Sequence, residues 1–188
     1  MNTENRVSPQ APEVEEAIIG ACLIEQEALP LVADKLRPEM FYVVRHQLIF
    51  ATMMAMYQAG TKIDILTVKE ELARRGTLED AGGAYNVTLL SSKVASSAHI
   101  EYHMKIVHEK YLRREMILGL NKLLACSLDE TMDIADTLVD AHSLLDRLEG
   151  EFGHNDTMRG MDALMTDTMK EAEARMAKSC LLYTSDAA

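Results

Sequence analysis

Tryptophan is absent from this 188-residue sequence, and the aromatic residues are limited to three phenylalanines and six tyrosines. Proline is also rare, with four residues, the last of which is Pro38. The remainder of the chain therefore lacks the residue that most strongly breaks helices. Thirteen methionines favour helix and tolerate irregular packing. Long helices are expected downstream of Pro38, with a core drawn from the 48% of residues that are hydrophobic.

Cysteine is scarce and scattered, with Cys22, Cys126 and Cys180 far apart in the sequence. No Cys-x-x-Cys occurs, which excludes a zinc knuckle or a redox pair of that kind, and we expect reduced, partly buried thiols. No apolar run approaches the ~18–20 residues needed to span a bilayer. The N-terminus has no hydrophobic signal segment. We therefore expect a cytoplasmic protein without membrane contact.

Positive charge is in deficit, with 19 Lys and Arg against 30 Asp and Glu, a net charge of −11. Proteins that grip nucleic acid through its phosphates normally carry a basic face, so autonomous DNA binding is not expected. Residues 43–75 have the outline of a helix-turn-helix. Their second helix, however, presents Lys69 beside Glu70 and Glu71, whose carboxylates would face phosphates. We predict a structural role for this helix.

The sequence also lacks the common motifs of nucleotide binding and nucleophilic catalysis. None of the nine glycines precedes a lysine, so there is no P-loop, and Gly82-Gly83 is typical of a turn. There is no Gly-x-Ser-x-Gly motif, and no cysteine lies in a recognisable nucleophile signature. The sequence therefore predicts neither a catalytic residue nor a cofactor-binding residue in this chain.

One histidine pair has the spacing of metal ligands. His99 and His103 lie four residues apart and would share one face of a helix. Glu101, the acid between them, falls about 200° around the helix from His99 at ~100° per residue, away from any metal on that face. We predict surface histidines and no metal site.

Helical patterns cover most of the chain, so the predicted fold class is all-α. Pro12, with acids in the turn that follows, is typical of a helix start. A short second helix, broken near Pro30, is expected to end at about Leu36, and a third is expected at about 43–58, closed by Gly60. Further helices are expected at about 64–75, 84–90 and 98–127. For the helix at 64–75, Asp64 or Thr67 is the predicted cap, and Thr67 with Glu70 fits a reciprocal capping box.

The predicted organisation is a compact helical N-terminal subdomain followed by a long antiparallel helical hairpin and a linker helix. The predicted boundaries are a disordered arm at 1–11, the globular subdomain at 12–95, the hairpin at 98–152, a linker with a helix at 153–178, and a non-native tail at 179–188. The tail does not continue the pattern of the helix before it, which indicates that the chain is a fragment.

The most regular apolar pattern lies in the second helix of the predicted hairpin. Its residues are spaced four, three, four, three and four apart, as in a heptad seam: Ile134, Leu138, Ala141, Leu145, Leu148 and Phe152. Residues 105–122 carry five basic and two acidic groups, whereas residues 127–156 carry nine acidic groups and one arginine. Complementary charge favours an antiparallel hairpin. A projecting hairpin buries its seam fully only against another chain, so we predict that these six residues mediate self-association.

With these elements in place, the chain resembles the N-terminal domain of the DnaB-type bacterial replicative helicase family. The resemblance lies in four segments: EVEEAIIGACLIEQEAL, MFYVVRHQLIFATMMAMYQAG, IDILTVKEELARRGTLEDAGGAY and SAHIEYHMKIVHEKYLRREMI. Phe41-Tyr42, His46 and Ile49-Phe50 stand at the family's positions. The segments cover about residues 12–152, and their order and spacing are specific as a set.

The resemblance implies a helical domain with a hairpin, joined through a linker helix to a RecA-like motor. In that family the hairpins pair as dimers, three of which form the N-terminal collar of a hexameric ring. The collar receives the C-terminal domain of primase within the primosome, and the linker helix docks on a neighbouring motor domain. The motor, with its Walker lysine, is absent from this sequence. The chain alone is therefore expected neither to hydrolyse ATP nor to unwind DNA, and ATP and Mg are expected only in the missing motor.

Two other functions stay open at this stage. One is an acidic helical protein–protein adaptor unrelated to replication, and the other is a small metal-dependent hydrolase that uses His99 and His103. Self-association would favour the helicase collar over the adaptor. Bound metal that a chelator removes would favour the hydrolase.

Overall fold

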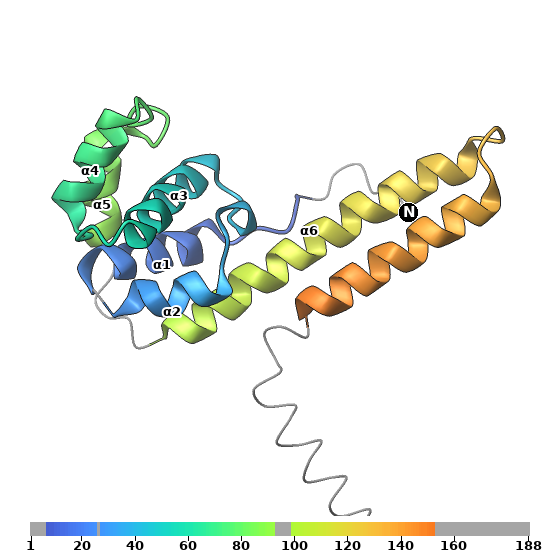
Figure 1. Cartoon of the computed structure of the whole chain (residues 1–188), viewed down its shortest axis with the longest axis horizontal. Helices are drawn as coiled ribbons and strands as arrows, with labels where there is room; N and C mark the ends of the chain where they lie inside the picture. Colours follow the sequence, from blue (N-terminus) through green and yellow to red (C-terminus); the bar gives the residue numbers. More distant parts are fainter. Residues whose placement is uncertain (1–6, 26, 93–98, 153–188) are drawn as a thin grey trace, which may run out of the picture. The chain divides into compact units, whose positions relative to one another are not determined.

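The computed structural model describes residues 7–25, 27–92 and 99–152, and within these ranges it contains helices and no strand. The helices are α1 (Pro12–Ile24), α2 (Ala28–Lys35), the 3-10 helix η1 (Pro38–Met40), α3 (Val44–Gln58), α4 (Ile65–Arg74), α5 (Gly83–Ser92) and α6 (Ile100–Leu128) (Figure 1). Residues 134–152 are helical as well. The predicted all-α fold class is confirmed. The linker helix, the tail at 179–188 and residues 1–6 of the arm lie outside the described residues.

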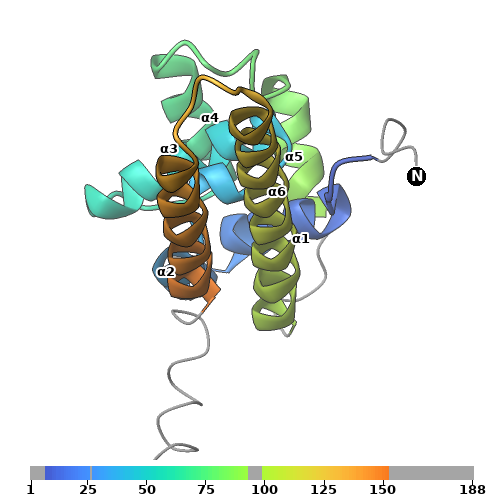
Figure 2. The same ribbon diagram turned by 90° about the vertical axis from the view of Figure 1, so that its right-hand side faces the viewer.

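The chain divides into two compact units, residues 1–140 and 141–188, with the boundary inside the helix 134–152. Within the first unit, α1 packs against α2, α3, α5 and α6. Figure 1 shows α1 and α2 against the first half of α6, and Figure 2 shows the same bundle turned by 90°. The largest fully buried side chains include Phe41, Phe50, Ile18, Ile19, Leu36, Met40, Ile49 and Met53. No helix in the described part of the chain has the length and apolarity that crossing a bilayer requires.

Two details of the predicted helix starts are wrong. Helix α2 is not broken at Pro30, which stands third in the helix. The N–H groups of a first turn have no partner within the helix, so proline is accepted there. Helix α4 is capped by Asp64, whose Oδ1 accepts the N–H of Thr67 at 2.9 Å, while Thr67 Oγ1 accepts the N–H of Asp64 at 2.9 Å. The capping box therefore joins Asp64 to Thr67 and does not include Glu70.

Glycines close two helices in the left-handed conformation. Gly60 has φ +67° and follows α3, as predicted, and Gly76 has φ +71° and follows α4. After α3, Gly60 N–H donates to Tyr57 O and Thr61 N–H donates to Met56 O. These two bonds form a Schellman motif, which satisfies carbonyls that the helix end leaves open.

The chain reverses direction after α6. Asp129 Oδ1 accepts the N–H of Thr131 at 3.0 Å, and Asp133 Oδ1 accepts the N–H of Ala135 at 2.8 Å. Lys122 Nζ then lies 3.1 Å from Asp140 Oδ2. Within the first unit, residues 134–140 thus return beside the end of α6 (Figures 1 and 2). The ion pair between Lys122 and Asp140 has the predicted signs, basic on α6 and acidic on the returning helix.

Candidate interface surfaces and a buried polar node

The predicted self-association seam is mostly open to solvent. Its exposed members are Ile134 (65%), Leu138 (56%), Leu145 (48%) and Phe152 (63%), while Ala141 and Leu148 are partly buried. Thr137 and Leu144, one heptad apart, are buried. The helix 134–152 therefore has buried residues at Thr137 and Leu144 and, beside them, a mostly exposed apolar stripe. The assignment of this stripe to self-association stays a prediction.

Helix α6 carries a second exposed apolar stripe along its C-terminal half. Ile117, Leu120, Leu124 and Leu128 recur at intervals of three, four and four residues, which places them on one helix face, and all four are exposed. Large contiguous apolar patches are uncommon on soluble monomers and mark interaction surfaces. Both stripes are therefore candidates for contact with another chain.

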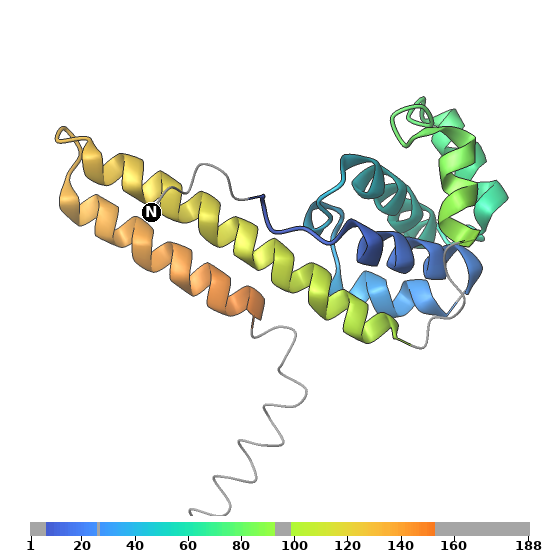
Figure 3. The ribbon, with the colours of Figure 1, turned by 180° about the vertical axis from the view of Figure 1, so that it is seen from behind.

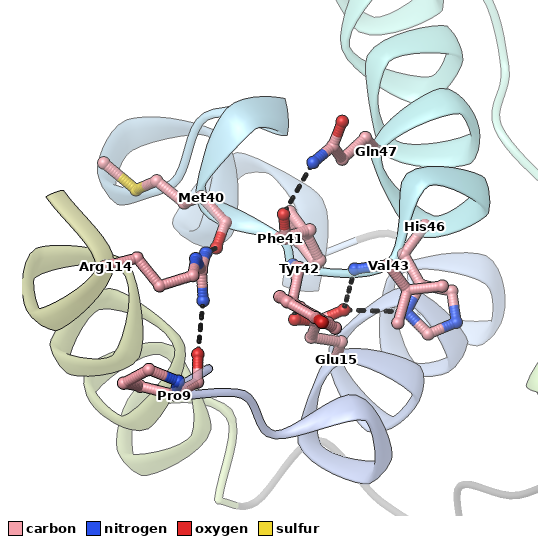
Figure 4. A network of polar contacts seen from close by, with 9 residues as sticks. All are labelled: Pro9, Glu15, Met40, Phe41, Tyr42, Val43, His46, Gln47 and Arg114. Atoms are coloured by element: carbon pink, nitrogen blue, oxygen red, sulfur yellow. Dashed lines mark hydrogen bonds and ion pairs between the residues drawn. The ribbon is translucent and has the colours of Figure 1, made fainter. Parts of the chain in front are cut away.

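A buried carboxylate organises the peptide that connects η1 to α3. Glu15 on α1 is 2% exposed, and its Oε1 accepts the Tyr42 N–H at 2.6 Å (Figure 4). Its Oε2 accepts the Val43 N–H at 3.2 Å and lies 2.9 Å from His46 Nδ1. Gln47 Nε2 donates to the carbonyl of Phe41 at 2.7 Å. Side chains thus satisfy backbone groups that no helix pairs here.

The guanidinium of Arg114, on α6, binds the start of the same η1–α3 connection, at Met40. Arg114 Nη2 donates to the carbonyl of Met40 at 2.7 Å, and Nη1 donates to the carbonyl of Pro9 at 3.0 Å (Figure 4). Its Cζ lies 5.6 Å from the centroid of the Tyr42 ring and 5.9 Å from that of Tyr111. Partial burial lowers the pKa of the Arg114 guanidinium from its ordinary value. We name this network the polar node, and its residues are Pro9, Glu15, Met40, Phe41, Tyr42, Val43, His46, Gln47 and Arg114.

The polar node was not predicted, although the sequence carries a signal for each of its two charges. Glu15 precedes Ile18, Ile19 and Cys22 by three, four and seven residues, so it shares their buried face. Arg114 follows Val107, a buried residue, by seven positions and lies on the face of α6 that packs on the bundle. A charge in phase with an apolar stripe indicates a buried polar contact. The predicted disordered arm at 1–11 includes Pro9, whose carbonyl accepts a hydrogen bond from Arg114.

The histidine pair and the two arginines that the sequence singled out do not form a functional site in the described residues. His99 is exposed and His103 partly buried, and no cluster of three or more potential metal ligands occurs within the described ranges. Glu71 Oε1 lies 2.7 Å from both Arg74 Nη2 and Arg75 Nε. Hydrogen bonds from Arg74 and then Arg75 lower the pKa of Glu71 to about 2. Because a carboxylate of the same helix holds both arginines, we interpret them as parts of the scaffold.

Two of the three cysteines lie within the described residues, and both are free thiols. Burial raises the pKa of the Cys22 thiol to about 12, so it is a neutral thiol at pH 7. Cys126 is also a free cysteine, and it is partly buried. Cys180 lies outside the described residues.

The comparisons with known proteins decide the family. The family model described as "DnaB-like helicase N terminal domain" matches residues 7–109. The chain belongs to this family. This DnaB-like domain is 41% identical over 175 residues to the replicative DNA helicase DnaB of Rhodothermus marinus. The match covers 90% of the chain but only 18% of that relative's length.

Two solved structures resemble this DnaB-like domain in fold. The N-terminal domain of DnaB helicase from Mycobacterium tuberculosis aligns with a TM-score of 0.70 and 29% identity, over 76% of this chain and 99% of that one. A DnaB-like replicative helicase, described together with its interactions with primase, aligns with a TM-score of 0.60 and 25% identity. That alignment covers 75% of this chain and 31% of the other. The predicted family is therefore confirmed.

Proposed function

We propose that this domain assembles and docks the subunits of a replicative helicase. Two copies pair through the apolar stripes of α6 and of the helix 134–152, and such dimers build the N-terminal collar of a hexameric ring. The observation that carries the proposal is the exposure of Ile134, Leu138 and Leu145 on a stripe with heptad spacing. Covering those side chains with the same stripe of a sister chain removes apolar surface from water, which is the main driving force of association.

The collar also receives primase, in this proposal, through the primase C-terminal domain. Support comes from the fold likeness to a helicase described with its interactions with primase. Titration of that primase domain into the full chain, followed by calorimetry, measures the interaction. Absence of heat at high concentration of both proteins would remove this part of the proposal.

The whole protein, in this proposal, is a cytoplasmic DNA helicase driven by ATP and Mg. Nucleotide binding belongs to the motor in this proposal, because the sequence carries no P-loop motif. A linker helix at 153–178, outside the described residues, joins the collar to the motor and docks on a neighbouring subunit. The chain's net charge of −11 supports a domain that meets other proteins and leaves DNA contacts to the motor.

The test is the mass of the particle in solution. Leu138→Asp combined with Leu145→Asp places two charges on the seam, and both residues are at least 48% exposed, so the single chain should keep its helices. We expect size-exclusion chromatography with light scattering to show an oligomer for the parent and a weaker assembly for the double variant, with unchanged circular dichroism. Leu66→Asp, at a 73% exposed position on α4, is the control that should associate like the parent. A double variant that associates like the parent would show that the seam is not the interface.

A further inference from the structure

Arg114 joins three segments of the first unit that are distant in sequence. Pro9 lies 105 residues before it in the segment that precedes α1, and Met40 lies 74 residues before it at the end of η1. The two carbonyls receive separate nitrogens of one guanidinium, at 3.0 Å and 2.7 Å. Hydrogen bonds from an ionised donor are stronger than neutral ones, and the planar fork fixes their direction.

The position of Arg114 along α6 is where that helix leaves the bundle. Ile100, Met104 and Val107 precede it and are buried in the core. Ile117 and Leu120 follow it and are exposed. Figure 3 shows residues 7–11, in dark blue, running beside α6 before the chain enters α1. The guanidinium therefore acts at the last part of α6 that the bundle supports.

The surroundings of the guanidinium hold it in this pose. The rings of Tyr42 and Tyr111 both face it, one from the η1–α3 connection and one from the preceding turn of α6. The peptide that bears the Met40 carbonyl is fixed in turn by Glu15, through the N–H groups of Tyr42 and Val43. The acceptor of Arg114 on the bundle side is thus held by Glu15, whereas its acceptor at Pro9 belongs to the segment that precedes α1.

We propose that residues 7–11 are a strap, fastened by Arg114, that sets the direction in which α6 leaves the globular bundle. With the strap in place, the Arg114 guanidinium on α6 bridges the N-terminal segment and the η1–α3 connection. Tilting of α6 then requires the hydrogen bonds to the Pro9 and Met40 carbonyls to break. With the strap released, the C-terminal half of α6 gains freedom to tilt while the buried core stays intact. The device is independent of the proposed function, because it concerns contacts within one copy of the chain.

Hydrogen exchange measured by mass spectrometry on the full chain tests the strap. Loss of two charge-assisted bonds in Arg114→Ala should speed exchange in peptides covering 7–15, 40–47 and 111–120 by about tenfold. Arg113→Ala is the matched control, since Arg113 is exposed and pairs with Glu109 on the surface of the same helix. It should leave 7–15 and 40–47 at parental rates, and a peptide covering 65–74 should stay unchanged in both variants.

Removal of the strap itself separates this proposal from a general packing role of Arg114. A chain that begins at Gln10, after an initiator methionine, lacks Pro9 but keeps Arg114 and the bundle. We expect this shortened chain to show faster exchange at 111–120. Introducing Arg114→Ala into it should then raise the exchange rate by a smaller factor than in the full chain. Arg114→Gln, which keeps the aliphatic stem and reaches one carbonyl at most, should give an intermediate rate. Parental exchange at 111–120 in the shortened chain, or at 7–15 in Arg114→Ala, would overturn the proposal.

Discussion

Nδ1 of His46 lies 2.9 Å from Oε2 of Glu15, and the two side chains are exposed by only 0% and 2%. The carboxylate already accepts the N–H groups of Tyr42 and Val43, so the ring nitrogen that faces it is a donor. The other ring nitrogen, Nε2, is buried and has no hydrogen-bond partner within the described part of the chain. Glu15 therefore accepts hydrogen bonds from three donors, the N–H groups of Tyr42 and Val43 and the ring of His46.

Glu15→Gln should destabilise the domain. The substituted amide retains one oxygen and turns an NH2 group toward groups that also donate, so at least one buried donor loses its acceptor. We expect a loss of about 1–3 kcal/mol in the free energy of unfolding, measured by urea denaturation. Glu13→Gln, an exposed acid in the same first turn, is the control and should change stability little. Equal stability of the two variants would contradict the role of the node.

The contact of Glu71 with its two arginines should make stability depend on pH in the acid range. The pKa of Glu71 is lowered from 4.5 to about 2 in the folded chain, so the unfolded chain binds the proton first as pH falls. The contribution of the ionised Glu71 to the free energy of unfolding is complete above about pH 4.5 and disappears as pH falls toward about 2. Urea midpoints of the parent and Glu71→Gln should therefore converge across this window. Glu70→Gln controls for the change in net charge, and a constant gap between the parent and Glu71→Gln would contradict the prediction.

Gly76→Ala should cost stability through the backbone alone. Gly76 has φ +71°, and no atom lies within 4 Å of the place where a Cβ would stand. The left-handed conformation of a residue with a Cβ costs about 1–2 kcal/mol, and thermal unfolding should report a loss of that size. Gly150→Ala is the opposite case, since Gly150 is helical and equally open, so a gain of about 0.5–1 kcal/mol is expected. The prediction fails if both substitutions have the same sign.

The helices were predictable because their signals are local. Pro12 at the start of α1 and the glycine after α3 act on the residues beside them, and the apolar period of each helix reports which face is buried. Errors at helix starts came from competing local signals. Asp64 and Thr67 are both good caps, and in the structure Asp64 precedes the helix while Ile65 packs against the core.

The polar node was not predictable as a constellation because it depends on pairing across the chain. Glu15 meets Tyr42 across 27 positions, and Arg114 meets Pro9 across 105. The phase of a charge within an apolar stripe indicates burial but does not name the partner. By contrast, the apolar stripe from Ile134 to Phe152 was predictable because its spacing is contained in one helix.

Beyond Arg114, helix α6 continues without interruption to Leu128, so a small bend at Arg114 becomes a larger displacement at the end of the helix. The 14 positions from Arg114 to Leu128 span about 21 Å at ~1.5 Å per residue. A change in inclination of about 10° at Arg114 therefore sweeps the tip through about 4 Å, by the geometry of a rigid lever. A displacement of that size is comparable with the width of a side-chain contact, so a small bend at Arg114 would move the exposed side chains of Leu124 and Leu128 by about one such width.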